Sequence, residues 1–248
     1  MHGEINVELW MVIPFAIMLL TIAIAPLVAE HFWAKNRNKL IFTAVISVVT
    51  VALLSSFGLG GAIVHNILYD YIPFVMLLLA LFVVTGGIRI SGDIAATPIV
   101  NTFILGAGFV MASVMGTTGA AMLLIRPLLQ INQQRIHRTH TVLFFIALVA
   151  NCGGLLTPLG DPPLFLLYLR GAHFMWFSEL WVEWLTVGVI LLAMYYALDH
   201  YFYYKKENTA NIMADIREQS PIRFSGLINV IYLIGIVLSV LFLNPSYI

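Results

Sequence analysis

The chain has 248 residues, of which 61% are hydrophobic and 10% are charged, and its formal net charge is zero. This composition is typical of an integral membrane protein and excludes an ordinary soluble domain. Because Cys152 is the single cysteine, an intrachain disulfide is excluded and a cysteine-based metal site is not expected.

Apolar segments follow one another along the whole chain, and most are near the roughly 20 residues that a helix needs to cross a bilayer. They lie at 9–29, 40–57, 72–88, 94–125, 142–169, 180–201 and 226–243. We therefore expect an all-α polytopic membrane protein. Two of the segments are unusual, and they predict one re-entrant helical hairpin and one broken helix beside about six transmembrane helices.

The segment 94–125 carries no formal charge. As one straight helix it would be about 48 Å long. That is too long for one crossing of about 30 Å and too short for two crossings with a turn. A re-entrant hairpin, whose two half-helices enter and leave on the same side, resolves the conflict. Its tip is expected at 113–119, where the segment is polar and rich in glycine.

The basic residues support both the hairpin and an orientation. With the N-terminus outside and 94–125 re-entrant, every Lys and Arg except Arg170 falls on the cytoplasmic side. This agrees with the excess of Lys and Arg in the cytoplasmic loops of membrane proteins. A full crossing at 94–125 would instead place Arg126, Arg135 and Arg138 outside.

The segment 142–169 is interrupted between Asn151 and Pro163 by several glycines and prolines and by a carboxylate, Asp161. Proline removes a backbone donor and glycine relaxes the backbone, so no continuous helix is expected there. Broken backbone at membrane depth is tolerated where protein or a water-filled cavity satisfies the freed groups, and a charge there indicates function. The interruption therefore predicts a discontinuous helix that lines an ion or solute site.

Asp161 directly precedes Pro162 and Pro163, so it is expected at the start of the second half-helix. One interpretation is an N-cap, because Asp is a favoured cap and Pro a favoured first helical residue. The other is a role in sodium or proton exchange, with or without capping. A carboxylate that binds either a sodium ion or a proton makes the two cations compete, which is the physical basis of cation/proton antiport.

The hairpin tip and the break each expose helix ends, and unwound carbonyls with half-helix C-termini favour cations. Side chains that can add neutral oxygen ligands are Ser113, Thr117, Thr118, Asn151 and Thr157. Glycines that would let the backbones approach closely are Gly116, Gly119, Gly153 and Gly154. For each Ser or Thr alone, helix packing is an equally good interpretation.

Residues 203–225 mix acidic, basic and amide side chains and are expected to form a cytoplasmic loop. A solvated linker is the favoured interpretation, and a short amphipathic helix is the alternative. Tryptophans near the outer end of the sixth segment are typical of an interfacial belt: Trp176, Trp181 and Trp184.

Several other polar residues receive no specific role. The cluster from Arg135 to His140 is interpreted as part of the positive-inside signal. Asp70 is placed in an external loop, and Asn101 and Asp199 are given no function.

The stretch from Asn151 to Leu166 resembles the signature of a bacterial sodium:proton antiporter family, also described as putative citrate transport, within the ion transporter superfamily. The hairpin tip at 112–120 and the following 122–127 are similar to that family as well. The resemblance is close over about 85–170 and looser elsewhere. It implies a secondary active transporter, not an enzyme, that performs sodium/proton antiport across the bacterial inner membrane, with its N-terminus in the periplasm.

In the related divalent-anion:sodium symporters, the first hairpin and the next helix break together form one sodium site. The matching positions in this chain are Ser113, Gly116, Thr117, Thr118, Asn151, Gly153, Gly154 and Thr157. Those symporters carry a Ser-Asn-Thr triplet at the tip, where this chain has Gly116-Thr117-Thr118. The difference argues against carboxylate recognition, and Asp161 favours antiport.

The resemblance also implies a homodimer in the lipid bilayer, a sodium ion as coupling or transported ion, and no other cofactor or nucleic acid. Family members contain a second hairpin and a second broken helix, so this chain is expected to be one half of an inverted-repeat transporter, with a C-terminal half as a partner. The expected divisions are scaffold-type helices at 1–93, the re-entrant hairpin at 94–128, the broken helix of the transport domain at 129–171, and further helices at 172–248.

Two other functions stay open. Sodium-coupled uptake of citrate or another small carboxylate would need cationic partners, and Arg126 is the only candidate near the expected site. Intramembrane aspartyl proteolysis would need two carboxylates that share a proton, and Asp70 and Asp161 would be the pair. A metal enzyme is not favoured, because the 7 histidines are scattered.

Overall fold

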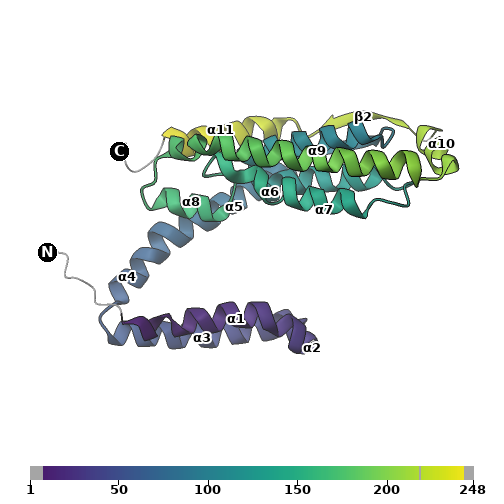
Figure 1. Cartoon of the computed structure of the whole chain (residues 1–248). Helices are drawn as coiled ribbons and strands as arrows, with labels where there is room; N and C mark the ends of the chain where they lie inside the picture. Colours follow the sequence, from purple (N-terminus) through teal and green to yellow (C-terminus); the bar gives the residue numbers. More distant parts are fainter. Residues whose placement is uncertain (1–7, 218, 243–248) are drawn as a thin grey trace. The chain divides into compact units, whose positions relative to one another are not determined.

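The computed structural model describes residues 8–217 and 219–242, which are almost entirely helical (Figure 1). In that part of the chain, 6 helices are long and apolar enough to cross a membrane. This confirms the expected all-α polytopic class. The chain divides into two compact units, Met1–Tyr69 and Asp70–Ile248. The helix that follows Asp70 packs on the helices of the second unit.

The first unit is built on two long apolar helices that pack side by side, α1 (Ile13–Val28) and α3 (Asn36–Ser56), joined through the short α2 (Glu30–Trp33). Neither long helix contains a buried residue. Exposed apolar side chains all round a helix are expected where lipid is the solvent. A 3₁₀ turn, Leu9–Val12, precedes α1, and α4 (Gly60–His65) follows α3.

Residues 60–71 are helical, although an external loop was expected there. After α4, a π-helical turn at Asn66–Tyr71 leads directly into α5 (Ile72–Gly86). Asp70 lies in this turn and its carboxylate pairs with Arg170 over 2.9 Å. Asp70 was placed in an external loop from the distribution of charges. The helical spacing of His65 and Tyr69 instead brings their rings together at a tilt, with 4.6 Å between ring centroids.

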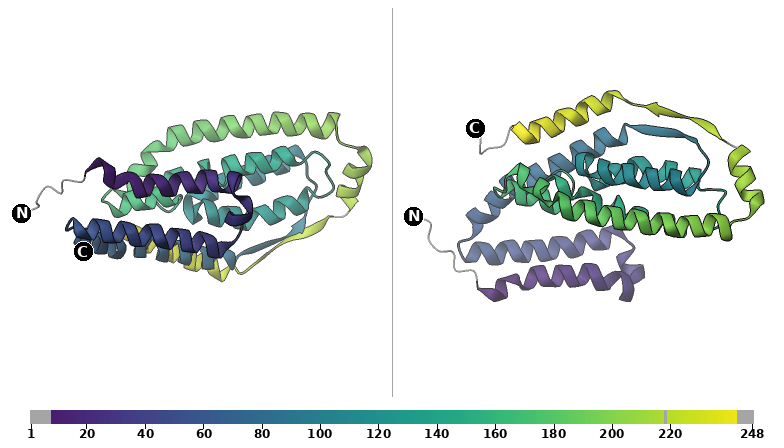
Figure 2. Two further views of the ribbon diagram at one scale, coloured as in Figure 1. Left: turned by 90° about the horizontal axis from the view of Figure 1, so that it is seen from below. Right: turned by 45° about the horizontal axis from the view of Figure 1, so that its top comes forward.

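The second unit surrounds one long element, α6 (Pro98–Ile131), with α5, α7 (Thr139–Leu148) and α9 (Trp181–Lys205) packed against it (Figure 2). Shorter elements complete the unit: a 3₁₀ turn at Cys152–Leu156, α8 (Pro162–Leu169), a 3₁₀ turn at Phe174–Leu180, α10 (Thr209–Arg217), and α11 (Ile228–Phe242). The buried hydrophobic core of the described residues lies along α6, and its fully buried members include Leu105 and Leu128.

The element α6 is a helical hairpin. Its backbone leaves helical geometry at Gly116, where φ is 79° and ψ is 152°. The two arms then run back along each other, and the side chains of Asn101 and Asn132 meet in hydrogen bonds of 2.8 and 2.9 Å. The fold-back lies within 113–119, the stretch expected for the tip.

A two-stranded antiparallel ribbon was not expected from the sequence. Its strands are β1 (Arg89–Asp93) and β2 (Ser220–Ser225), with Arg89 opposite Ser225 and Ser91 opposite Arg223. Residues 203–225 are therefore more than a solvated linker, since they contain both α10 and β2. The sequence does not predict this pairing, because the two strands lie far apart in the sequence and each is only 5 or 6 residues long.

Candidate functional site

The predicted helix break is present between α7, which ends at Leu148, and α8, which begins at Pro162. Only a short 3₁₀ turn, Cys152–Leu156, interrupts the irregular backbone between them. The side-chain amide of Asn151 donates to the carbonyl oxygen of Ile146 over 2.8 Å. This contact satisfies a carbonyl near the end of α7, and Asn151 itself is exposed.

The break is held on the hairpin by hydrogen bonds from within its 3₁₀ turn and from the residues that follow the turn. The Ser113 hydroxyl donates to the carbonyl oxygen of Gly153 over 2.5 Å. The Thr157 hydroxyl donates to the carbonyl oxygen of Ser113. The backbone N–H of Thr117 donates to the carbonyl oxygen of Gly160 over 2.8 Å. Backbone polar groups that the helix break leaves free thus bond to the hairpin tip, and those of the tip bond to the break. In low-dielectric surroundings an unpaired polar group is costly, so such pairing is required.

Two glycines of the break touch each other. A Cβ placed on Gly160 would lie 1.9 Å from the carbonyl oxygen of Gly154, and one on Gly154 would lie 2.5 Å from the carbonyl oxygen of Gly160. No residue with a side chain fits either position without moving the backbone. One close approach of two backbones thus lies within the break, and another joins Gly153 to the Phe109 carbonyl of the hairpin.

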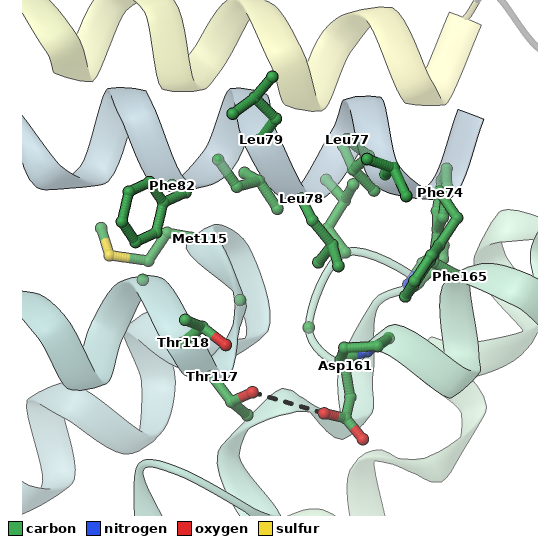
Figure 3. Close-up of a pocket in the computed structure, with 18 residues that line it drawn as sticks. Phe74, Leu77, Leu78, Leu79, Phe82, Met115, Thr117, Thr118, Asp161 and Phe165 are labelled. Atoms are coloured by element: carbon green, nitrogen blue, oxygen red, sulfur yellow. Dashed lines mark hydrogen bonds between the residues drawn. The ribbon is translucent and has the colours of Figure 1, made fainter. Parts of the chain in front are cut away.

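A cavity of about 410 Å³ lies between α5, the hairpin tip and the start of α8 (Figure 3). Its walls are mostly apolar, with Leu77 and Phe82 of α5 and Phe165 of α8 among them. Side-chain oxygens are contributed by Thr117, Thr118 and Asp161. Of the part of the chain that the structure describes, Asp161 is the only charged residue that lines this cavity.

Asp161 and Thr117 lie next to each other at one edge of the cavity (Figure 3). The Thr117 hydroxyl donates to a carboxylate oxygen of Asp161 over 3.4 Å, and the two come from the hairpin and the break (Figure 3). Asp161 occupies the N-cap position of α8, but its side chain makes no capping hydrogen bond. The carboxylate is therefore directed to the hairpin, not to the helix that it begins.

The cavity separates the predicted site residues into two sets. Those that line it are Gly116, Thr117, Thr118 and Asp161. Those that lie outside its lining are Ser113, Asn151, Gly153, Gly154 and Thr157. Most of the second set holds the break against the hairpin through the contacts described above.

The two arginines nearest the site in sequence lie elsewhere. Arg126 is exposed and is not part of the cavity lining, and Arg170 is engaged by Asp70. In the described parts of the chain no hydrogen bond joins Asp70 to Asp161, and no group of three or more His, Cys, Asp or Glu side chains comes together to hold a metal ion.

A buried polar network at the base of the hairpin was missed by the sequence reasoning. Asp199 of α9 is fully buried and its carboxylate binds Arg135 at 2.6 Å and His140 at 2.8 Å. Asn101 and Asn132 adjoin it. An available signal was the carboxylate itself, because an ionisable residue inside an apolar helix calls for a partner.

Comparison with known proteins identifies one family. A family model described as putative citrate transport matches residues 4–247. No curated protein and no solved structure matches the chain significantly.

Proposed function

The chain belongs to the putative citrate transport family, and from this membership and the cavity at Asp161 we propose that it is a cation-coupled secondary transporter that performs sodium/proton antiport. The protein is a multi-pass membrane protein of a transporter family. The finer proposal concerns the coupling ion. A sodium ion and a proton compete for the Asp161 carboxylate, and the cavity gives both access to it.

The observation that carries the proposal is the charge of the cavity. Its described lining contains a carboxylate and no Lys, Arg or His. A negative group among apolar walls attracts a cation and repels an anion, and the weak screening in such surroundings strengthens both effects. Oxygen ligands suit a hard cation, and Thr117 and Thr118 add two hydroxyl oxygens.

The remaining predicted residues have a positioning role in this proposal. Ser113 binds both Gly153 and Thr157, and these two contacts hold the break on the hairpin tip. Asp161 then stays within reach of Thr117 when the cavity is empty. An ion that binds between Thr117 and Asp161 in place of their hydrogen bond finds both side chains already positioned. This lowers the entropy cost of ordering them on binding.

We further propose that the hairpin is re-entrant, with both ends at the cytoplasmic face of the bacterial inner membrane and the N-terminus in the periplasm. Its base lies beside the basic end of α9, because Arg135 binds Asp199 and the backbone N–H of Ile136 donates to Glu207. Lys205, Lys206 and Arg217 follow at the same end. Cytoplasmic loops are the usual place for such a concentration of basic residues.

Sodium-coupled uptake of citrate or another carboxylate is the second candidate, and the family description favours it. A carboxylate substrate needs donors and cations near the coupling site. The described cavity supplies none of the cations, so in this version they come from elsewhere: a second copy of the chain in a homodimer, or a C-terminal half that completes the inverted repeat.

The test is Asp161→Asn in everted membrane vesicles with a fluorescent pH probe. We expect sodium-dependent proton movement in the wild type and its loss in the variant, with unchanged thermal unfolding. Asp70→Asn is the matched control, since Asp70 lies outside the cavity and should retain activity. Full activity of Asp161→Asn would remove this carboxylate from the mechanism. Sodium-dependent uptake of labelled citrate without proton exchange would favour the second candidate.

A further inference from the structure

Trp184 of α9 reaches the helix break, although it was expected in an interfacial belt with Trp176 and Trp181. Those two side chains are 46% and 57% exposed, which fits a belt. Trp184 is instead partly buried, and its indole N–H donates to the carbonyl oxygen of Gly153 over 3.1 Å. The contact joins α9 to the centre of the candidate site.

The carbonyl of Gly153 thereby receives two donors from two different elements. One is the Ser113 hydroxyl of the hairpin at 2.5 Å, and the other is Trp184. A carbonyl oxygen has two lone pairs, and here both have partners. We infer that this carbonyl orients the break and does not coordinate the ion.

The indole ring is itself held by the hairpin. It stacks on Phe109 with 4.3 Å between ring centroids and 16° between the planes. One turn further along α9, Gly188 makes room for the same phenyl ring, since a Cβ there would lie 2.4 Å from a Phe109 ring carbon. Phe109 also approaches Gly153 through its backbone, because a Cβ on Gly153 would lie 2.6 Å from the Phe109 carbonyl oxygen. The position of the Trp184 ring is therefore set by its contacts with the hairpin, independently of its hydrogen bond to the break.

We propose that Trp184 is a positioning residue for the cation site: by holding the Gly153 carbonyl, it keeps Asp161 opposite Thr117. The connection is short and stiff. Gly154, next to Gly153, touches Gly160, and Gly160 accepts a hydrogen bond from Thr117 and directly precedes Asp161. Movement of Gly153 is thus transmitted through two backbone contacts to the carboxylate. The effect on ion binding rests on the proposed function, but the effect on the break does not.

The first experiment uses Cys152, the single cysteine, which adjoins Gly153 and is partly buried. The rate of its labelling by a maleimide reports how often the break opens. Trp184→Phe keeps a six-membered aromatic ring to stack on Phe109 and removes the fused pyrrole ring that carries the indole N–H. We expect labelling to be faster by about three- to tenfold, the factor for one lost neutral hydrogen bond. Trp181→Phe is the matched control on the same helix and should label at the wild-type rate.

Either of two results would overturn the proposal. Equal labelling of Trp184→Phe and the wild type would show that the indole does not hold the break. Equal acceleration in Trp184→Phe and Trp181→Phe would show a general loosening of α9.

A further check combines Ser113→Ala with Trp184→Phe. Because both donors bind one carbonyl, their effects on the labelling rate should be non-additive, and strict additivity would contradict a shared acceptor.

The second experiment measures sodium-dependent proton movement in vesicles. A positioning role predicts that Trp184→Phe raises the sodium concentration for half-maximal response by a similar three- to tenfold and leaves the maximal rate nearly unchanged. An unchanged half-maximal concentration would refute the link from Gly153 to Asp161. If the wild type shows no sodium response, the proposed function fails, while the Cys152 labelling still decides whether Trp184 holds the break.

Discussion

Asn101 and Asn132 lie 31 positions apart in sequence and exchange side-chain hydrogen bonds of 2.8 and 2.9 Å. In a straight helix the two residues would be separated by about 46 Å. Both side chains are almost fully buried, at 0% and 1% exposure. This pair closes the hairpin at its base, opposite the turn at Gly116, and so fixes the length of both arms.

Removing one partner of this pair should destabilise the protein. Asn132→Ala leaves the Asn101 amide buried and without its main partner, so we expect a loss of about 1–3 kcal/mol in the free energy of unfolding. Denaturant titration in detergent micelles measures it. Gln130→Ala, two residues earlier on the exposed side of the same arm, should change stability by less than about 0.5 kcal/mol. Equal losses in the two variants would show that the asparagine pair does not close the hairpin.

The turn of the hairpin depends on glycine at position 116. Its φ of 79° lies in the left-handed region, and a Cβ there would also lie 3.2 Å from the carbonyl oxygen of Leu159. With ψ at 152°, this is a conformation that essentially only glycine adopts, so Gly116→Ala should cost about 1–3 kcal/mol of stability from the backbone conformation alone. It should also reduce sodium-dependent activity, because Gly116 lines the cavity.

Gly235→Ala in α11 is the control for that substitution. A Cβ at Gly235 meets nothing within 4 Å, and the backbone there is helical. The change should be neutral or stabilising by up to about 1 kcal/mol, since alanine has the higher helix propensity. A neutral Gly116→Ala would mean that the tip adopts another conformation.

Two ion pairs of the second unit, Arg135–Asp199 and Arg170–Asp70, should differ sharply in their effect on stability. Asp199→Asn leaves the Arg135 guanidinium, which is 2% exposed, without its carboxylate partner, and should cost about 3–5 kcal/mol. Arg170→Gln removes the partner of Asp70 at a site where the Arg170 side chain is 66% exposed, and should cost about 1 kcal/mol or less. Comparable losses would contradict the burial of the Asp199 network.

A double substitution in the same network separates the cost of burying an unpaired charge from the loss of the Arg135–Asp199 ion pair. Arg135→Met combined with Asp199→Asn removes the uncompensated charge, so the double variant should be more stable than the Asp199→Asn single variant. Lower stability of the double variant would show that Arg135 contributes mainly through packing, for example on the Tyr203 ring at 5.3 Å.

Glu207 should make stability depend on pH at the base of the hairpin. Burial alone would raise the pKa of this carboxyl, but hydrogen bonds from the backbone N–H groups of Ile136 and His137 and from Asn211 hold the pKa below its usual range. A lowered folded-state pKa gives stability that is fully present above the unfolded pKa of about 4.3 and is lost as the pH falls through the folded value.

Thermal unfolding midpoints of the wild type and Glu207→Gln, followed from pH 7 to about pH 3, test this. We expect the wild type to be more stable at pH 7 and the difference to shrink as the pH falls below about 4.3. Glu179→Gln, at a position with an exposed side chain, should show no such convergence. A constant difference across the range would show that the Glu207 charge does not contribute.

Several features of the site follow from the sequence near each residue. The break between Asn151 and Pro163 was predicted because glycine and proline act on their own backbone, and the structure places it there. Asp161 was predicted at the start of the second half-helix, and it is the N-cap residue of α8. The tip of the hairpin was predicted from the length of an uncharged segment and the glycines in its middle.

Other features could not be predicted in this way, because each depends on a partner far along the chain. Trp184 fits an aromatic belt when judged by its neighbours, and only packing brings its N–H to Gly153. Arg135 fits a positive-inside loop residue until Asp199 is placed beside it. The β1–β2 ribbon pairs segments more than a hundred residues apart.

The sequence by itself therefore determined that this is a polytopic membrane protein with two interruptions, because hydropathy and the backbone chemistry of glycine and proline are local properties. Only the tertiary structure decided which polar groups meet. It set Asp161 against Thr117, assigned Ser113, Gly153 and Thr157 to one another, and buried Asp199 with Arg135. In an apolar environment every polar group requires a partner, and the fold selects that partner from those within reach.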